Sequence, residues 1–360
     1  MKQEAHWLKT MGSSLKGKLH REKTKNVENA GEGQKSGKKT IEKNAITEGV
    51  IWKQLLIFFF PIMLGTLIQQ LYTTVDTIIV GRFVGKAALA SVGGPAAVLS
   101  TIVVTFFNGL ANGAAVIIAQ YYGAKDRKSL HVGIHTAYLF SVVISLIVSL
   151  TGTVLTPWLL KIMNTPQDMM TDSITYLRIY FMGILFTLVY NMGSAIMRAV
   201  GDSRRPLLYL LICCVMNIIL DIAMVVGMKM GIAGAALATV ISQCVSAVLV
   251  TWSLTRAYDA MKLKFRELRM DARVLRKELK IGVPGALQAC AYGVTNVVIQ
   301  ASVNSFGTDT AAGWAAYGKL DMIFWTVSSA LGAAVTTFAG QNYGAGKMDR
   351  VYKMYPGECR

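Results

Sequence analysis

The chain has 360 residues, of which 53% are hydrophobic and only 16% are charged, and its mean hydropathy is +0.44. A soluble protein of this size needs more charge to cover its surface, so the composition excludes that class and indicates a polytopic membrane protein. The net charge of +17 is also compatible with nucleic-acid binding. However, the basic residues are not interleaved with aromatic residues on a folded module, and we expect no nucleic-acid partner.

Residues 1–46 are rich in Lys, Glu, Gly, Asn and Ser and have almost no apolar periodicity. Such a segment cannot bury enough surface to offset its ordering entropy, so we predict a disordered basic cytoplasmic tail. Four of the five cysteines lie in later apolar segments, and none forms a CxxC pair. They are expected to be small buried hydrophobes, with no disulfide framework and no metal site.

Eight apolar segments of helix length follow this tail. A helix needs roughly 20 mostly apolar residues to cross a bilayer, whereas membrane strands are shorter and alternate in polarity. The sequence therefore predicts an all-α polytopic membrane protein. The predicted spans are residues 52–80, 88–120, 131–156, 174–197, 206–228, 232–255, 280–305 and 312–341.

The distribution of basic residues predicts the orientation of these spans. With the N-terminus inside the cell, 31 of the 37 Lys and Arg residues lie on the cytoplasmic side. Cytoplasmic loops of membrane proteins collect Lys and Arg, so we expect a multi-pass protein of the cell membrane with a cytoplasmic N-terminus.

An internal repeat relates the first two spans to the last two. Phe60-Pro61 matches Val283-Pro284, and AQYYGAKDR (119–127) matches GQNYGAGKMDR (340–350). Because an even number of spans separates the copies, they are predicted to be parallel repeats. The expected organisation is a six-helix N-lobe (47–256), a cytoplasmic linker (257–279) and a partial C-lobe with two helices (280–360). The chain is expected to be the front part of a twelve-helix architecture.

Four segments resemble the multidrug and toxic compound extrusion (MATE) transporters, and the resemblance runs from about residue 47 to residue 353. It implies a cation-coupled antiporter with two six-helix lobes around a central cavity that opens to one side at a time. It also implies export of amphipathic, often cationic drugs in exchange for protons or sodium. The segments are QQLYTTVDTIIVGRFVGKAALASVGG (69–94), RAVGDSRRP (198–206), NIILDIAMVVGMKMGIAGAALATVISQ (217–243) and GQNYGAGK (340–347).

Two carboxylates inside the predicted spans are candidates for ion coupling, Asp76 in the first and Asp221 in the fifth. An ionisable group in a span costs about 2.5–3.5 kcal/mol on insertion scales, which makes each a functional candidate. Asn217 lies one turn before Asp221 and so shares its face, and Thr239 could add an oxygen. The resemblance agrees, because these four residues match the first-lobe cation site proposed for the proton-coupled archaeal-type branch. The predicted seventh span holds no carboxylate, so we expect coupling in the first lobe, by protons rather than sodium.

Polar and aromatic residues in the spans are candidates for lining a substrate cavity, because aromatic faces suit organic cations. Ordinary packing is the alternative for each of them. Proline can kink a helix, so Pro61 and Pro284 are candidates for conformational change, with a static kink as the alternative. The cavity candidates are Gln69, Gln70, Tyr72, Tyr190, Met192, Met197 and Tyr317.

Other functions have weaker support in the sequence. No GxxxxGK[ST] motif occurs, which argues against a P-loop ATPase, and the HxxxH formed by His131 and His135 has no third ligand nearby. We expect no enzymatic activity and no cofactor apart from the coupling ion. The expected partners are a small-molecule substrate and the lipid bilayer, with no obligate protein partner evident. The alternatives left open are a lipid or lipid-linked oligosaccharide flippase of the same superfamily, and an inactive truncated fragment.

Overall fold

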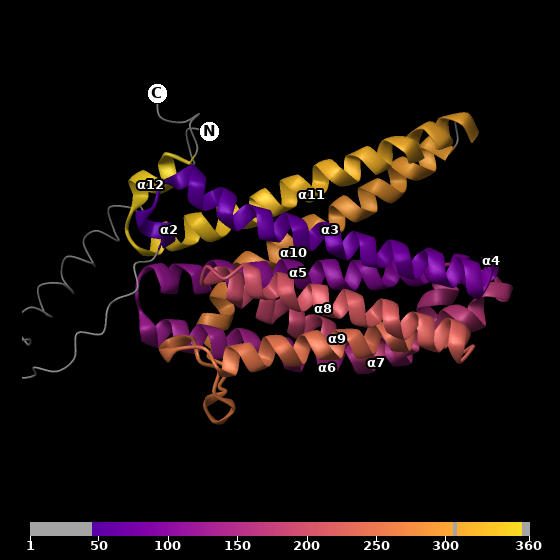
Figure 1. Ribbon diagram of the computed structural model, residues 1–360, viewed down its shortest axis with the longest axis horizontal. Coiled ribbons are helices and arrows are strands. Elements are labelled where there is room, and N and C mark those ends of the chain that lie inside the picture. Colours follow the sequence, from indigo (N-terminus) through magenta and orange to yellow (C-terminus); the bar gives the residue numbers. More distant parts are fainter. Residues whose placement is uncertain (1–44, 305–307, 355–360) are drawn as a thin grey trace, which may run out of the picture. The chain divides into compact units, whose positions relative to one another are not determined.

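The computed structural model describes residues 45–304 and 308–354, which belong to one compact unit. The predicted disordered tail and Cys359 lie outside these residues, apart from the last two residues of the tail. Every regular element in the described ranges is helical, which confirms the all-α prediction (Figure 1). The long helices are α3 (Ile51–Phe83), α5 (Ala97–Gly123), α6 (Arg127–Ile162), α7 (Gln167–Ala199), α8 (Arg204–Asp221), α9 (Gly231–Thr255), α10 (Ala272–Asn304) and α11 (Thr308–Gly344).

Short helical segments connect the long ones. Two π-helical segments, η1 and η2, continue from α4 and α8, and two 3₁₀ turns lie in the predicted linker. Their bounds are α2 (Ala45–Glu48), α4 (Lys86–Ser91), η1 (Val92–Ala96), η2 (Ile222–Gly227), η3 (Asp259–Met261), η4 (Phe265–Glu267) and α12 (Met348–Tyr352).

Seven of the described helical segments are long and apolar enough to cross a membrane, whereas eight spans were expected from the sequence. The segment that does not qualify is α10, which covers the predicted span 280–305. The first turns of α10 carry charges, and part of the predicted span, which runs to residue 305, lies outside the described residues. Its assignment as a span stays a prediction, although its 33 residues are long enough to cross.

Aspartate side chains cap the starts of three helices at the charged turns. Asp126 accepts hydrogen bonds from the Ser129 amide at 3.1 Å and the Ser129 hydroxyl at 2.7 Å, and these bonds lower the pKa of the carboxyl. Asp202 accepts from the first amides of α8 and Asp271 from those of α10. Each cap satisfies amides that a helix start leaves without partners, which is why the chain re-enters a helix at these turns.

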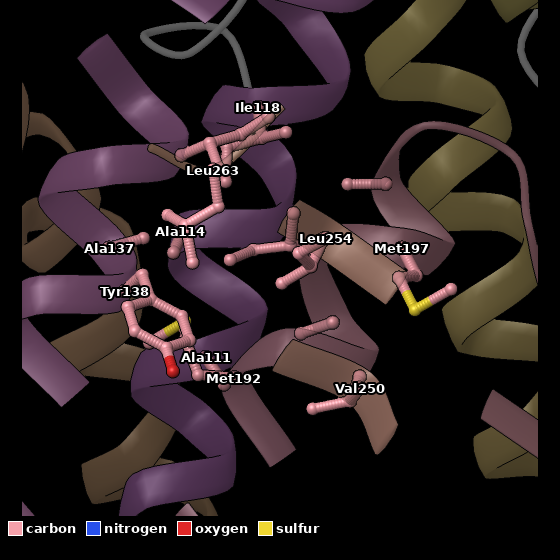
Figure 2. Close-up of a cluster of buried hydrophobic side chains, with 14 of the residues drawn as sticks. Ala111, Ala114, Ile118, Ala137, Tyr138, Met192, Met197, Val250, Leu254 and Leu263 are labelled. Atoms are coloured by element: carbon pink, nitrogen blue, oxygen red, sulfur yellow. The ribbon is translucent and has the colours of Figure 1, made fainter. Parts of the chain in front are cut away.

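The largest core cluster joins α5, α6, α7 and α9, as Figure 2 shows. Small residues of α5 such as Ala111 and Ala114 face Tyr138 and Met192, so these helices pack closely. The one polar group that Tyr138 brings into the cluster is hydrogen-bonded, since its hydroxyl lies 2.9 Å from the Thr251 hydroxyl. A second cluster joins α3, α4, α7 and α9.

The two copies of the internal repeat meet in space. A Cβ added at Gly123, at the end of α5, would collide with the carbonyl oxygen of Gln341 in α11. A Cβ added at Gly344, at the end of α11, would collide in the same way with the carbonyl oxygen of Gln120. Gly123 matches Gly344 in the repeat, and Gln120 matches Gln341. The repeated motif therefore supplies a reciprocal glycine contact between the two helices, which no larger side chain would permit.

Beside this contact, basic and amide side chains of α11 and α12 hold the backbone around α2. The Arg350 guanidinium donates to the carbonyl oxygens of Ile46 at 3.2 Å and Gly49 at 2.7 Å, and also to Asn342 Oδ1 at 3.0 Å. The Lys347 ammonium donates to the Thr47 carbonyl at 2.9 Å. We call this group of contacts the α2–α12 junction.

The predicted linker is fixed to α6 through the two histidines. His135 Nδ1 lies 2.8 Å from the His131 carbonyl, and His135 Nε2 accepts the Lys264 amide at 3.0 Å. The His131 ring contacts Glu267 at 2.8 Å. Both nitrogens of His135 are therefore occupied by backbone groups, and the described residues contain no cluster of metal-ligating side chains.

Candidate functional site

Asp76 and Asp221 come together between α3 and α8. Asp76 is 8% exposed and Asp221 is fully buried, and their carboxyl groups are close enough to interact with each other. Asn217, one turn before Asp221 on α8, is also fully buried. The i, i+4 spacing read from the sequence thus places an amide and a carboxyl on the helix face that is turned toward α3.

Two tyrosines and a threonine surround this pair. The Tyr72 hydroxyl donates to the Thr239 hydroxyl at 3.4 Å, which joins α3 to α9. Tyr176, on α7, lies close enough to both carboxyl groups to interact electrostatically with them. We call Asp76, Asp221 and Asn217, with Tyr72, Tyr176 and Thr239 around them, the carboxyl cluster.

Several buried polar atoms of the carboxyl cluster have no hydrogen-bond partner. Among the described residues, neither polar atom of the Asn217 amide has a hydrogen-bond partner. No donor among them reaches either oxygen of Asp221 or Oδ1 of Asp76. Unpartnered buried polar groups are uncommon and call for an explanation. A hydrogen bond between two carboxyl groups requires a proton on one of them, and the oxygens could instead hold a small cation. The cluster therefore has the chemistry of a cation-binding site.

The backbone at the end of α8 is also unusual. The helix changes from α to π geometry at Ile222, directly after Asp221, and remains π-helical through η2. Short π segments inside helices are rare and are frequent at functional sites.

A cavity of about 510 Å³ lies between α3, α5, α7, α8 and α11. Its wall mixes amides and hydroxyls with aliphatic groups and includes one charged side chain, Arg198, among the described residues that line it. A polar and apolar lining of this kind suits an amphipathic organic ligand. The amides and hydroxyls of the wall come from Thr66, Gln69, Asn108, Asn112, Tyr190, Asn191, Ser194, Ser203, Ser329, Thr336 and Thr337.

Of the seven predicted cavity residues, Gln69 and Tyr190 line this cavity. Tyr72 belongs to the carboxyl cluster instead. Met197 lies in the core cluster of Figure 2. Met192 belongs to the same cluster and lines a much smaller pocket of α5, α6 and α7.

The remaining two candidates make contacts with residues of α11. Gln70 donates to the Met322 sulfur at 2.8 Å, and the Tyr317 hydroxyl donates to Asp321 at 3.3 Å. Neither lines the cavity of about 510 Å³.

The two prolines differ in their surroundings. Pro61 lies within α3, in the half of the helix nearer its start at Ile51, and lines the cavity. Pro284 lies within α10 and is exposed.

Three residues of interest were not identified from the sequence. Tyr176 carries no signal beyond an ordinary core tyrosine. Arg198 was treated only as a topology charge. Glu278 was assigned to the linker, but α10 already begins at Ala272, so Glu278 is on that helix. It is 3% exposed, and its Oε1 has no partner among the described residues. An apolar-run criterion misses it because the run begins only afterwards.

Comparison with known proteins gives consistent matches. The sequence matches the family described as MatE over residues 61–223 and 284–355. It is 35% identical over 312 residues to the probable multidrug resistance protein YpnP of Bacillus subtilis, covering 85% of this chain and 68% of that protein. It is 29% identical over 310 residues to the probable multidrug resistance protein YoeA of the same organism, covering 84% and 66%.

The fold is similar to that of a MATE protein solved in the bent conformation. The TM-score is 0.80 at 24% sequence identity, and the match covers 88% of this chain and 71% of that one. The chain spans about two thirds of the length of the two curated relatives.

Proposed function

The chain belongs to the MatE family of multidrug efflux transporters, and we propose that it moves small amphipathic organic compounds out of the cell in exchange for a cation. The proposed mechanism is alternating access, in which the cavity between α3, α5, α7, α8 and α11 opens to one side of the membrane at a time. Proteins of this family are transporters and not enzymes.

The observation that carries this proposal is the carboxyl cluster. Asp76 and Asp221 are buried close to each other, and Oδ1 of Asp76 and both oxygens of Asp221 have no partner among the described residues. Buried ionisable groups in a membrane segment are costly, and unpaired ones are costlier still. Retaining such a pair makes physical sense where a cation comes and goes, because each event changes the net charge that the surrounding helices must hold.

We propose the proton as the coupling ion. A single proton bridging the two carboxyl groups satisfies one oxygen on each of them and leaves one net negative charge. Loss of this proton leaves two carboxylates in contact, whose repulsion favours separation of α3 from α8. Tyr72 and Tyr176 border the pair, so a change of its charge acts directly on α3 and α7.

Pro61 is proposed as the point where α3 bends during this cycle. Proline removes a backbone hydrogen bond and so weakens the helix locally. Pro61 lies between the α2–α12 junction and Asp76, and its side chain lines the cavity. Bending there would change the shape of the cavity when the charge of the carboxyl pair changes.

The membrane placement completes the proposal. Seven apolar helices and the family identify a multi-pass membrane protein. We propose the cell membrane as its location and a cytoplasmic N-terminus, which puts the charged turns at Asp126, Asp202 and Asp271 inside the cell.

The experiment is efflux of a fluorescent amphipathic dye from proteoliposomes under an imposed pH gradient. Asp221→Asn keeps the shape of the side chain but cannot exchange a proton, so it should abolish gradient-driven efflux. Asp321→Asn, an isosteric change on α11 outside the carboxyl cluster, is the matched control and should retain efflux. Replacing sodium with potassium should leave efflux intact. Unchanged efflux in Asp221→Asn would remove this residue from the mechanism.

A further inference from the structure

Arg198 lies in the cavity wall, and its position near a cytoplasmic turn does not explain this. It lies at the end of α7, and it is the one charged side chain among the described residues that line the cavity. Its guanidinium makes no ion pair or hydrogen bond with any described residue. The neighbouring Arg205 is different, because it is exposed and pairs with Asp202 at 3.3 Å.

The direction of the Arg198 side chain follows from its relation to Tyr190. Both residues line the cavity from α7, where they are eight positions, or about two turns, apart. The Tyr190 hydroxyl donates to the Pro206 carbonyl at 3.1 Å. Side chains of a helix lean toward its N-terminus, which here is toward the cavity. The guanidinium therefore reaches back along α7 beside the cavity wall instead of extending away from it.

Other polar groups of the wall can also donate hydrogen bonds to an anion. Asn108 and Asn112 lie one turn apart on α5 and are exposed to the cavity, and Asn191 faces it from α7. Amide groups of asparagine can donate hydrogen bonds to an oxyanion, and a guanidinium can donate two to one carboxylate or phosphate. No Asp or Glu is among the described residues that line the cavity.

The wall also carries aliphatic side chains from α3 and α8. Ile62, Leu207 and Leu210 face the cavity there. A ligand with one anionic group and an apolar body would place its charge at Arg198 and its body along these residues. A purely cationic ligand would meet the positive charge of Arg198 with no carboxylate to offset it.

We propose that the cavity binds amphipathic compounds that carry an anionic group, a carboxylate, sulfonate or phosphate, with Arg198 as the residue that recognises this group. The proposal rests on the proposed export function and specifies the charge of its substrates. The anionic group could belong to a free organic anion or to the headgroup of an anionic lipid, because both offer the same oxyanion to Arg198.

The test is equilibrium binding to the purified 360-residue chain in phosphatidylcholine nanodiscs, followed by fluorescence. The probes are dansylglycine, which is an anion, and dansylcadaverine, which carries the same fluorophore on a cation. The wild type should bind dansylglycine at least about tenfold more tightly, since a charge-assisted hydrogen bond contributes that much. Arg198→Gln should remove this preference and Arg198→Lys should keep part of it.

Two further variants make the result specific. Arg205→Gln removes the same charge seven residues away but outside the cavity wall, and it should not change either affinity. Asn112→Asp adds a negative charge to the wall from α5 and should weaken dansylglycine binding even if Arg198→Gln does not fold. Equal affinities for the two probes in the wild type, or equal effects of Arg198→Gln and Arg205→Gln, would overturn the proposal.

A lipid arm distinguishes the two sources of the anion. Phosphatidylglycerol is introduced into the nanodiscs in place of part of the phosphatidylcholine. A loss of dansylglycine affinity in the wild type that is absent in Arg198→Gln assigns the site to anionic lipid. Unchanged affinity assigns it to free organic anions. Neither binding result depends on ion coupling, so failure of this proposal and failure of the Asp221 efflux experiment are separate outcomes.

Discussion

The α2–α12 junction and the carboxyl cluster both contain polar groups between helices, but they differ in whether those groups are hydrogen-bonded. At the junction, Arg350 and Lys347 donate to backbone carbonyls and to an amide oxygen. In the cluster, buried oxygens of Asp76 and Asp221 have no donor among the described residues. Satisfied polar networks stabilise one arrangement, whereas unsatisfied ones cost free energy unless something else binds. We therefore propose that the junction stays closed and that the cluster receives an ion.

The largest effect on stability is expected at the reciprocal glycine contact beside the junction. In Gly123→Ala the new methyl group would collide with the Gln341 carbonyl, so α5 and α11 must move apart. Overpacking of this kind costs about 3 kcal/mol, and we expect a marked fall in the Tm of the purified chain in detergent. Gly285→Ala, in α10, is the control, because a Cβ there meets nothing within 4 Å. Equal melting of the two variants would show that the glycine contact does not hold the repeats together.

The next effect is loss of the charged group that organises the junction. Arg350→Gln removes donors to Ile46 and Gly49, and hydrogen bonds to charged groups are worth about 2 kcal/mol. We expect a lower Tm and faster proteolysis near residues 45–50. Lys353→Gln removes the same charge from an exposed position three residues later and should leave both unchanged. Identical behaviour of the two variants would contradict the role assigned to Arg350.

A substitution in the carboxyl cluster is not expected to lower the stability of the protein. Asp221→Asn removes a buried ionisable group that has no donor, so it should raise the free energy of unfolding by about 1 kcal/mol or leave it unchanged. The measurement is the same thermal melt that is used for Arg350→Gln. A clear loss of stability in Asp221→Asn would mean that this carboxyl is a structural group like those of the junction.

The smallest effect concerns the exposed contacts between the linker and α6. The hydrogen bond from Lys264 lowers the pKa of Glu267, with a further contribution from His131, below its ordinary value of 4.5. A carboxyl with a lowered pKa in the folded state stabilises the protein above its ordinary pKa, and this stabilisation is lost as the pH falls through the folded value. Glu267→Gln should therefore melt slightly below the wild type at neutral pH, and the difference should vanish in acid. A difference that does not depend on pH would exclude the charge of Glu267 as its cause.

Much of the architecture could be predicted from the sequence, because apolar length and loop charge are local properties. The repeat offsets also identified Gln120 with Gln341. The sequence could not reveal that the two copies of the repeat touch, because contact between α5 and α11 depends on how whole helices pack. Glu278 was missed for a local reason, because the Asp271 cap begins α10 before its apolar run.

The candidate site was predicted unevenly. Asp76 and Asp221 were selected because buried charge is costly wherever it occurs, and this argument needs no knowledge of packing. Tyr72 and Met197 were selected by residue type, but residue type does not say which face of a helix lines a cavity. One contacts Thr239 and the other lies in the core. Arg198 was set aside because its position near a turn has an ordinary explanation.

The most direct test of the central claim is infrared spectroscopy of the purified chain, which detects the carbonyl stretch of a protonated, buried carboxyl group. Sharing of one proton by Asp76 and Asp221 predicts one such band that is lost in both Asp76→Asn and Asp221→Asn. Glu278→Gln, which alters another buried carboxyl, should retain it. Persistence of that same band in both aspartate variants, or its loss in only one of them, would contradict a shared proton as the basis of coupling.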